Sequence, residues 1–115
     1  MRSFLVYTLG FCLIPLAACS SGEVACTLIA TVSVTVEVVD GTGAPVTDAD
    51  LTYTVNGGPS KPCEQVFENS YDCGTEEAGD FVITANRDAS TKTASVTVTA
   101  DECHVIGQTL TMTID

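Results

Sequence analysis

The stretch that decides the fold is TVSVTVEV, residues 31–38. Every second residue from Val32 to Val38 is valine, and threonine, serine or glutamate stands between them. Successive side chains of a strand point to opposite faces, so this alternation predicts a strand with one buried side and one solvent-facing side. No segment after Cys19 shows the sustained period of an amphipathic helix. We therefore expect an all-β domain.

The same alternation recurs along the rest of the chain. It is present in residues 51–55, 81–86, 93–100 and 109–114, and glycine, proline, asparagine and aspartate separate these runs. Two shorter runs, CEQVFE and YDCGTE, predict a hairpin around Asn69-Ser70. Seven short strands of this kind predict a β-sandwich in which antiparallel pairing dominates.

The segment DGTGAPVTDAD, residues 40–50, raises the question of a phosphate or metal site. A dinucleotide-binding loop needs a third glycine and a following helix, and this segment has neither. A calcium-binding EF-loop needs an acid at regular positions and a final glutamate, which are also missing. The segment is therefore expected to be the bend between two strands.

The first residues, MRSFLVYTLGFCLIPLAACSSG, have the pattern of an export signal. Arg2 precedes an apolar run that is too short for a stable transmembrane helix. The run ends in Leu-Ala-Ala-Cys, which resembles the lipobox of bacterial lipoproteins, and the resemblance implies cleavage before Cys19 and lipid on that cysteine. The alternative is an ordinary signal peptide that ends in cysteine. Ser20, rather than aspartate, after the cysteine favours passage to the outer membrane.

This interpretation divides the chain into three parts. Residues 1–18 are expected to be a signal peptide that is removed, residues 19–25 a lipidated cysteine with a short tether, and residues 26–115 the β-sandwich domain. Beyond Cys19 lie all 15 acidic residues and only three basic ones, Lys61, Arg87 and Lys92, so the mature chain has a net charge of −12. A surface with this much negative charge repels nucleic acid and anionic lipid headgroups. It suits an exported protein of the cell envelope.

The six cysteines fit an exported protein. Cys12 leaves with the signal, Cys19 carries lipid, and four remain: Cys26, Cys63, Cys73 and Cys103. An even number in an exported domain predicts two disulfides, with three possible connectivities. A structural zinc site needs closely spaced ligand pairs, and no CxxC occurs, so we expect no metal and no cofactor.

Three segments together resemble the carboxypeptidase regulatory-like, transthyretin-like domain. They are VVDGTGAPVTDADLTY (residues 38–53), EAGDFVITA (residues 77–85) and SVTVTADECHVIGQTLTMTID (residues 95–115). The resemblance implies a seven-stranded sandwich that serves as a binding or structural module. One enzymatic branch of this fold, the hydroxyisourate hydrolases, uses several histidines and a Tyr-Arg-Gly-Ser tail, which this chain lacks.

The resemblance also implies a disulfide pairing. First and last strands of such sandwiches are parallel neighbours, and this implies that Cys26 pairs with Cys103 and Cys63 with Cys73. The second pair requires a longer loop or a bulge, because a two-residue turn on Asn69-Ser70 would place Cys73 opposite Val66.

Few residues qualify for a site. Phe67 and Tyr71 flank the expected hairpin tip and are the candidates for stacking on a ligand. His104 is the only histidine, and it would need a nucleophile and an orienting acid to act as a base. Acidic loop residues around Asp40, Asp72 and Asp101 are expected to be solvated, with calcium binding as the alternative.

These observations predict a non-catalytic, lipid-anchored envelope protein that binds a partner or has a structural role. The expected contacts are the membrane, through lipid on Cys19, and an envelope protein or glycan. Alternatives are a carbohydrate-binding or inhibitor module that uses exposed loops and, less favoured, a hydrolase.

Overall fold

The computed structural model describes residue 26 and residues 28–115. These residues contain eight strands and no helix, which confirms the all-β class. The strands are β1 (Val32–Val39), β2 (Asp50–Val55), β3 (Lys61–Pro62), β4 (Glu64–Phe67), β5 (Ser70–Thr75), β6 (Gly79–Arg87), β7 (Ser90–Val98) and β8 (Gln108–Thr113). In particular, no helix in this part of the chain is long and apolar enough to cross a membrane.

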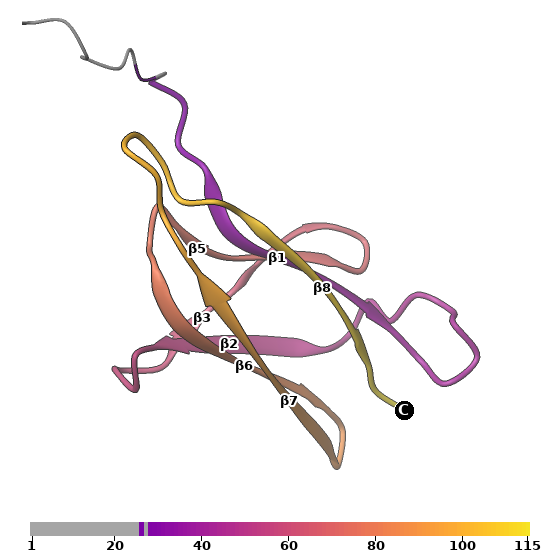
Figure 1. Cartoon of the computed structure of the whole chain (residues 1–115). Coiled ribbons are helices and arrows are strands. Elements are labelled where there is room, and N and C mark those ends of the chain that lie inside the picture. The colour runs from indigo at the N-terminus through magenta and orange to yellow at the C-terminus, as the bar shows by residue number, and fades with distance from the viewer. Residues whose placement is uncertain (1–25, 27) are drawn as a thin grey trace, which may run out of the picture.

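The strands form two sheets of four, which lie as two layers (Figure 1). One sheet has the order β4-β5-β1-β8 and the other the order β3-β2-β6-β7. β1 and β8 run parallel, and every other neighbouring pair is antiparallel. The arrangement is compatible with a β-sandwich. It has eight strands instead of the expected seven because β3 is too short to show a pattern in the sequence.

The core fills the space between the layers, and most of its residues come from the alternating runs of the sequence. From the first sheet come Val34, Val36 and Val38 of β1, all fully buried. Phe81 and Ile83 of β6 meet them from the second sheet, and they are equally buried. Val46, Leu51, Tyr53, Val98, Met112 and Ile114 complete this cluster together with smaller side chains. The ring of Tyr53 stacks on that of Phe81 at a centroid distance of 5.5 Å.

Ser33 departs from the expected pattern. It belongs to the polar face of the TVSVTVEV stretch, yet it is fully buried. Its hydroxyl donates to the carbonyl of Glu77 at 2.8 Å and accepts from the Glu77 N–H at 2.9 Å. A buried hydroxyl with both bonds satisfied is tolerated in an interior. Ser33 thus fixes the loop between β5 and β6 against β1.

The segment from Asp40 to Pro45 is a bend, as the sequence predicted. One carboxylate oxygen of Asp40 accepts hydrogen bonds from the N–H groups of Thr42 at 2.8 Å and Ala44 at 3.0 Å. Gly43 has a φ of 88°, which favours glycine. These contacts close the turn on itself, and Val46 then enters the core. The Asp40 carboxylate is therefore occupied by its own loop.

Candidate functional site

Three regions carry the side chains that could serve a function: the surface around β4, the cluster around Glu77, and the end of the domain where the chain enters. Cys19, the expected lipid attachment site, lies outside the described residues.

The hairpin of β4 and β5 positions Phe67. Its turn lies on Glu68 and Asn69, one residue earlier than expected, and Glu68 has a φ of 41°. Pairing passes from Gln65↔Tyr71 to Phe67↔Ser70, so Val66 is the extra residue of a bulge. The bulge brings Cys63 opposite Cys73, whose Cα atoms are 4.4 Å apart in a disulfide. This is the bulge that the second cysteine pair was expected to require.

Phe67 and Tyr71 lie in different environments. The Phe67 side chain is 69% exposed on an edge strand, next to the half-exposed Val66. Tyr71 is only 3% exposed, and its hydroxyl donates to the Ala49 carbonyl at 2.9 Å. The prediction of a ligand-stacking role is therefore wrong for Tyr71, because the side chain belongs to the core. Its position two residues from Cys73, which is also buried, is the sequence signal that could have placed it inside.

The outer face of this sheet, to which Phe67 belongs, also carries carboxylates. Glu64 lies directly opposite Asp72, and Asp72 is also the neighbour of Thr35 on the other side. Partial burial, together with the charge of Glu64, raises the pKa of Asp72 above its ordinary value. The four strands of this sheet contain no lysine, arginine or histidine. The face around Phe67 is therefore acidic and has no basic residue of its own sheet.

A second polar cluster joins the two sheets through Glu77. One of its carboxylate oxygens accepts from the Tyr53 hydroxyl at 3.1 Å, and the other pairs with Lys61 at 2.8 Å. The Lys61 ammonium also lies 5.8 Å from the centre of the Tyr53 ring. The hydrogen bond that Lys61 donates to the Glu77 carboxylate raises the pKa of Lys61. Every charged group of this cluster has a partner, which indicates a structural role.

The basal end, where the chain enters the domain, comprises residues 26, 28–31 and 101–107. A disulfide between Cys26 and Cys103, with Cα atoms 5.3 Å apart, joins its two segments. Glu76 joins them a second time, since its carboxylate accepts from the N–H groups of Thr31 at 2.9 Å and Val105 at 3.1 Å. The same segments lie side by side at the top of Figure 1.

His104 belongs to this end. Its Nδ1 pairs with the Glu76 carboxylate. That hydrogen bond, reinforced by the backbone N–H of Thr31, holds the pKa of Glu76 below its ordinary value. The adjacent Cys103 is in a disulfide and cannot act as a thiolate nucleophile. The His104–Glu76 pair thus serves to fix the basal end.

The acidic loop residues do not gather as metal ligands. Among the residues that the structure describes, no three His, Cys, Asp or Glu side chains lie close enough to hold a metal ion. Asp101 accepts from the N–H groups of Cys103 and His104, and these bonds lower its pKa. Like Asp40, it is used by its own loop.

No family model matches this chain, and no characterised protein or solved structure was found to be similar to it.

Proposed function

We propose that this chain is a lipid-anchored module of a bacterial cell envelope that acts by binding a partner and not by catalysis. The observation that carries the proposal is the Cys26–Cys103 disulfide. It fixes the chain, seven residues after Cys19, to one end of the domain. An anchor attached at Cys19 would hold that end at the membrane. Disulfides also belong to oxidising compartments outside the cytoplasm.

A transthyretin-like sandwich is part of the proposal. The feature that supports it is the parallel pairing of the first and last long strands, in which Val34 lies beside Gln108 and Val38 beside Met112. This pair makes the sheet a mixed one, whereas purely antiparallel sheets are over-represented among proteins.

The anchor is tested by labelling and fractionation. The full chain is expressed in a bacterium with two membranes and grown with labelled palmitate. We expect label and membrane association for the natural sequence, and loss of both in Cys19→Ser. Cys12→Ser is the matched control, because it removes a cysteine of the signal segment, and it should keep both. Label that persists in Cys19→Ser would overturn the proposal.

Phe67 favours a second candidate function, a carbohydrate-binding or inhibitory module. An exposed aromatic ring on a rigid, disulfide-stapled hairpin is a common anchor in recognition. Capture of purified cell-wall glycan or of a protein partner by the natural chain, lost in Phe67→Ala and kept in Val82→Ala, would support it. Equal capture by both variants would count against it.

A further inference from the structure

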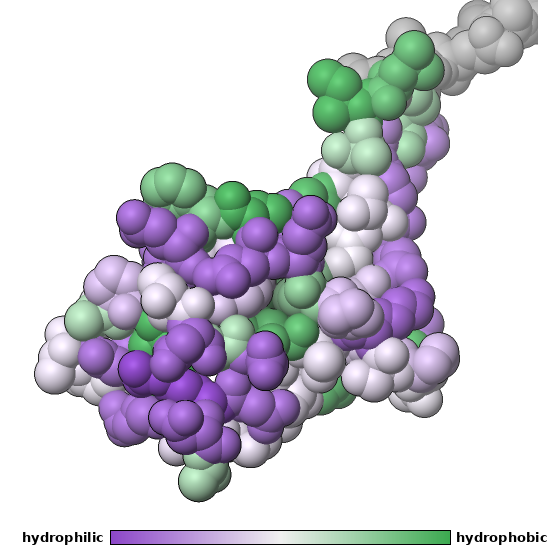
Figure 2. All heavy atoms as spheres, turned by 180° about the vertical axis from the view of Figure 1, so that it is seen from behind, coloured by the Kyte–Doolittle hydropathy of each residue, from purple (hydrophilic) through white to green (hydrophobic). Residues whose placement is uncertain are grey.

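The basal end carries an exposed apolar cluster. Leu28 is 102% exposed, Ile29 77% and Ile106 49%. They are three of the six large apolar side chains that are exposed in the described part of the chain, and the others lie on β4 and β6. In Figure 2, one of the groups of hydrophobic atoms lies directly beside the grey atoms. A grouping of this kind at one end points to an interaction surface.

The two segments of the cluster are held together. The Cys26–Cys103 disulfide lies beside them, and Glu76 bonds to both Thr31 and Val105. A Cβ atom on Gly107 would lie 2.8 Å from the Val32 carbonyl oxygen, so the backbones at these two positions nearly touch. The two backbone segments that carry the exposed apolar side chains are therefore held side by side.

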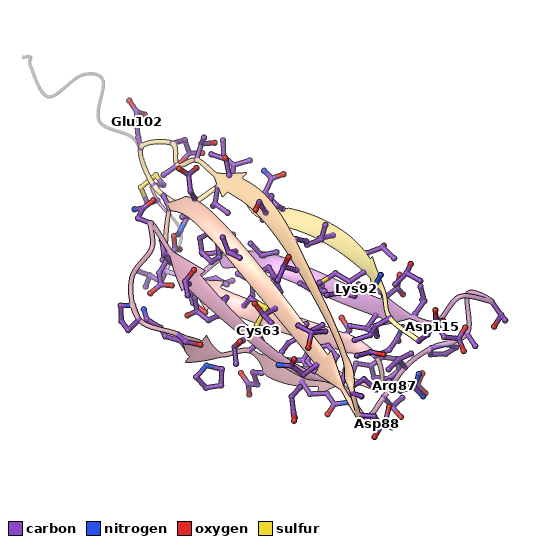
Figure 3. All side chains as sticks on the ribbon, turned by 90° about the horizontal axis from the view of Figure 1, so that it is seen from below. Cys63, Arg87, Asp88, Lys92, Glu102 and Asp115 are labelled. Carbon is purple, nitrogen blue, oxygen red and sulfur yellow. A yellow bond between two sulfur atoms is a disulfide. The ribbon has the colours of Figure 1, made fainter. Side chains whose placement is uncertain are left out.

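Charge at this end disfavours an anionic partner. Glu102 lies at the extreme of the basal end, whereas Arg87 and Lys92 lie at the opposite end of the molecule (Figure 3). Neither basal segment contains lysine or arginine. With no such cation and an exposed glutamate, the cluster is suited to contact a surface through apolar burial and not through attraction to negative headgroups.

We propose that Leu28, Ile29 and Ile106 insert among the headgroups of the membrane that holds Cys19, in a contact with net-neutral phospholipid. The inference rests on the proposed lipid anchor. The chain from Cys19 to Cys26 spans at most about 25 Å when fully extended, at about 3.5 Å a residue. The basal end therefore remains within reach of the bilayer surface, and apolar side chains there lower the free energy by entering it.

The test attaches the chain to vesicles chemically, so that it does not require lipidation of Cys19 by a cell. The mature chain, residues 19–115, is coupled through the Cys19 thiol to a maleimide-bearing phospholipid in phosphatidylcholine vesicles. The remaining cysteines are in disulfides, so only Cys19 should react. Amide hydrogen exchange is measured on the vesicles and on the same chain capped with a small maleimide in solution. Leu28→Ser/Ile29→Ser/Ile106→Ser is compared with Val66→Ser/Phe67→Ser/Val82→Ser, the matched control.

We expect amides of residues 28–32 and 103–107 to exchange roughly fivefold more slowly on vesicles, because lipid contact excludes water from them. The basal variant should lose this protection and the control should keep it. Equal exchange on vesicles and in solution would overturn the inference, as would protection that survives in the basal variant or that requires phosphatidylglycerol. The chemical coupling to vesicles does not depend on lipidation in cells, so the two experiments test separate claims. Failure of palmitate labelling in cells would refute the lipid anchor on Cys19. Absence of protection on vesicles would refute the contact of the basal end with the bilayer and leave the anchor untouched.

Discussion

At the scale of single residues, Tyr71 is expected to contribute to the stability of the fold, whereas the exposed Phe67 is not. Tyr71→Phe removes the hydroxyl that bonds to the buried Ala49 carbonyl. We expect it to lower the free energy of unfolding by about 1 kcal/mol. Phe67→Ala removes an exposed ring and should change it by less than about 0.5 kcal/mol. Chemical denaturation followed by circular dichroism compares the two. An equal loss in both would contradict this assignment of buried and exposed side chains.

Asp72 is a residue whose charge opposes folding. Glu64 stands directly across from it, and like charges in that position are destabilising. Asp72→Asn is therefore expected to raise the free energy of unfolding by about 0.5 kcal/mol at neutral pH. The raised pKa of Asp72 leads to the same expectation. A carboxyl whose pKa is raised in the folded state destabilises the fold when it is ionised, and its protonation favours the folded state. Glu37→Gln, which removes a carboxylate from the same face, is the control, and a lower stability for Asp72→Asn would refute the assignment.

At the scale of elements, the β4–β5 hairpin depends on its disulfide. All four residues of β4 are exposed, and the strand is paired only with β5. Cys63→Ala/Cys73→Ala is expected to cost about 3 kcal/mol by the chain-entropy model for a loop of this length. Exchange of the β4 amides should accelerate more than that of β6. A uniform acceleration would instead indicate that the hairpin unfolds only with the whole domain.

The elements also show what the sequence can and cannot predict. Long strands such as β1 and β6 bury one face, so their sequences alternate between apolar and polar residues. That alternation predicts which face is buried and where most of each strand begins and ends. β3 has two residues and no alternation, and its pairing with Tyr53 is a consequence of tertiary structure. The one-residue shift of the turn to Glu68-Asn69 follows from a bulge, which inserts a residue without any local sequence signal.

The candidate sites were less predictable than the strands, because they depend on contacts between residues that are distant in the sequence. Phe67 was placed on the surface correctly, whereas Tyr71 depends on which face of β5 is buried. Ser33 has the residue type of an outer face, and only the approach of Glu77 from a distant loop explains why it is buried. The basal cluster joins residues more than seventy positions apart in sequence, which no local pattern contains.

At the scale of the whole molecule, stability should fall in acid. Asp40, Glu76 and Asp101 all have lowered pKa values because hydrogen-bond donors surround their carboxylates. A carboxylate with a lowered folded pKa stabilises the fold above its unfolded pKa, and that contribution is lost as the pH falls through the folded value. We expect the melting temperature to decline below about pH 4. Glu76→Gln should decline less steeply than the natural chain, and identical profiles would contradict the role of Glu76.

The parallel pairing of β1 with β8 has a consequence for biogenesis. β1 is a central strand, and its two neighbours are β5 and β8. Val34 lies beside Cys73 of β5, but it acquires its second partner, in the parallel pair, only when Gln108 is present. A polypeptide that emerges amino terminus first, from a ribosome or a translocation channel, therefore cannot complete this sheet until almost its entire length is available. Contacts between such distant positions also form slowly. The topology thus delays closure of this sheet until the carboxyl-terminal strand is available.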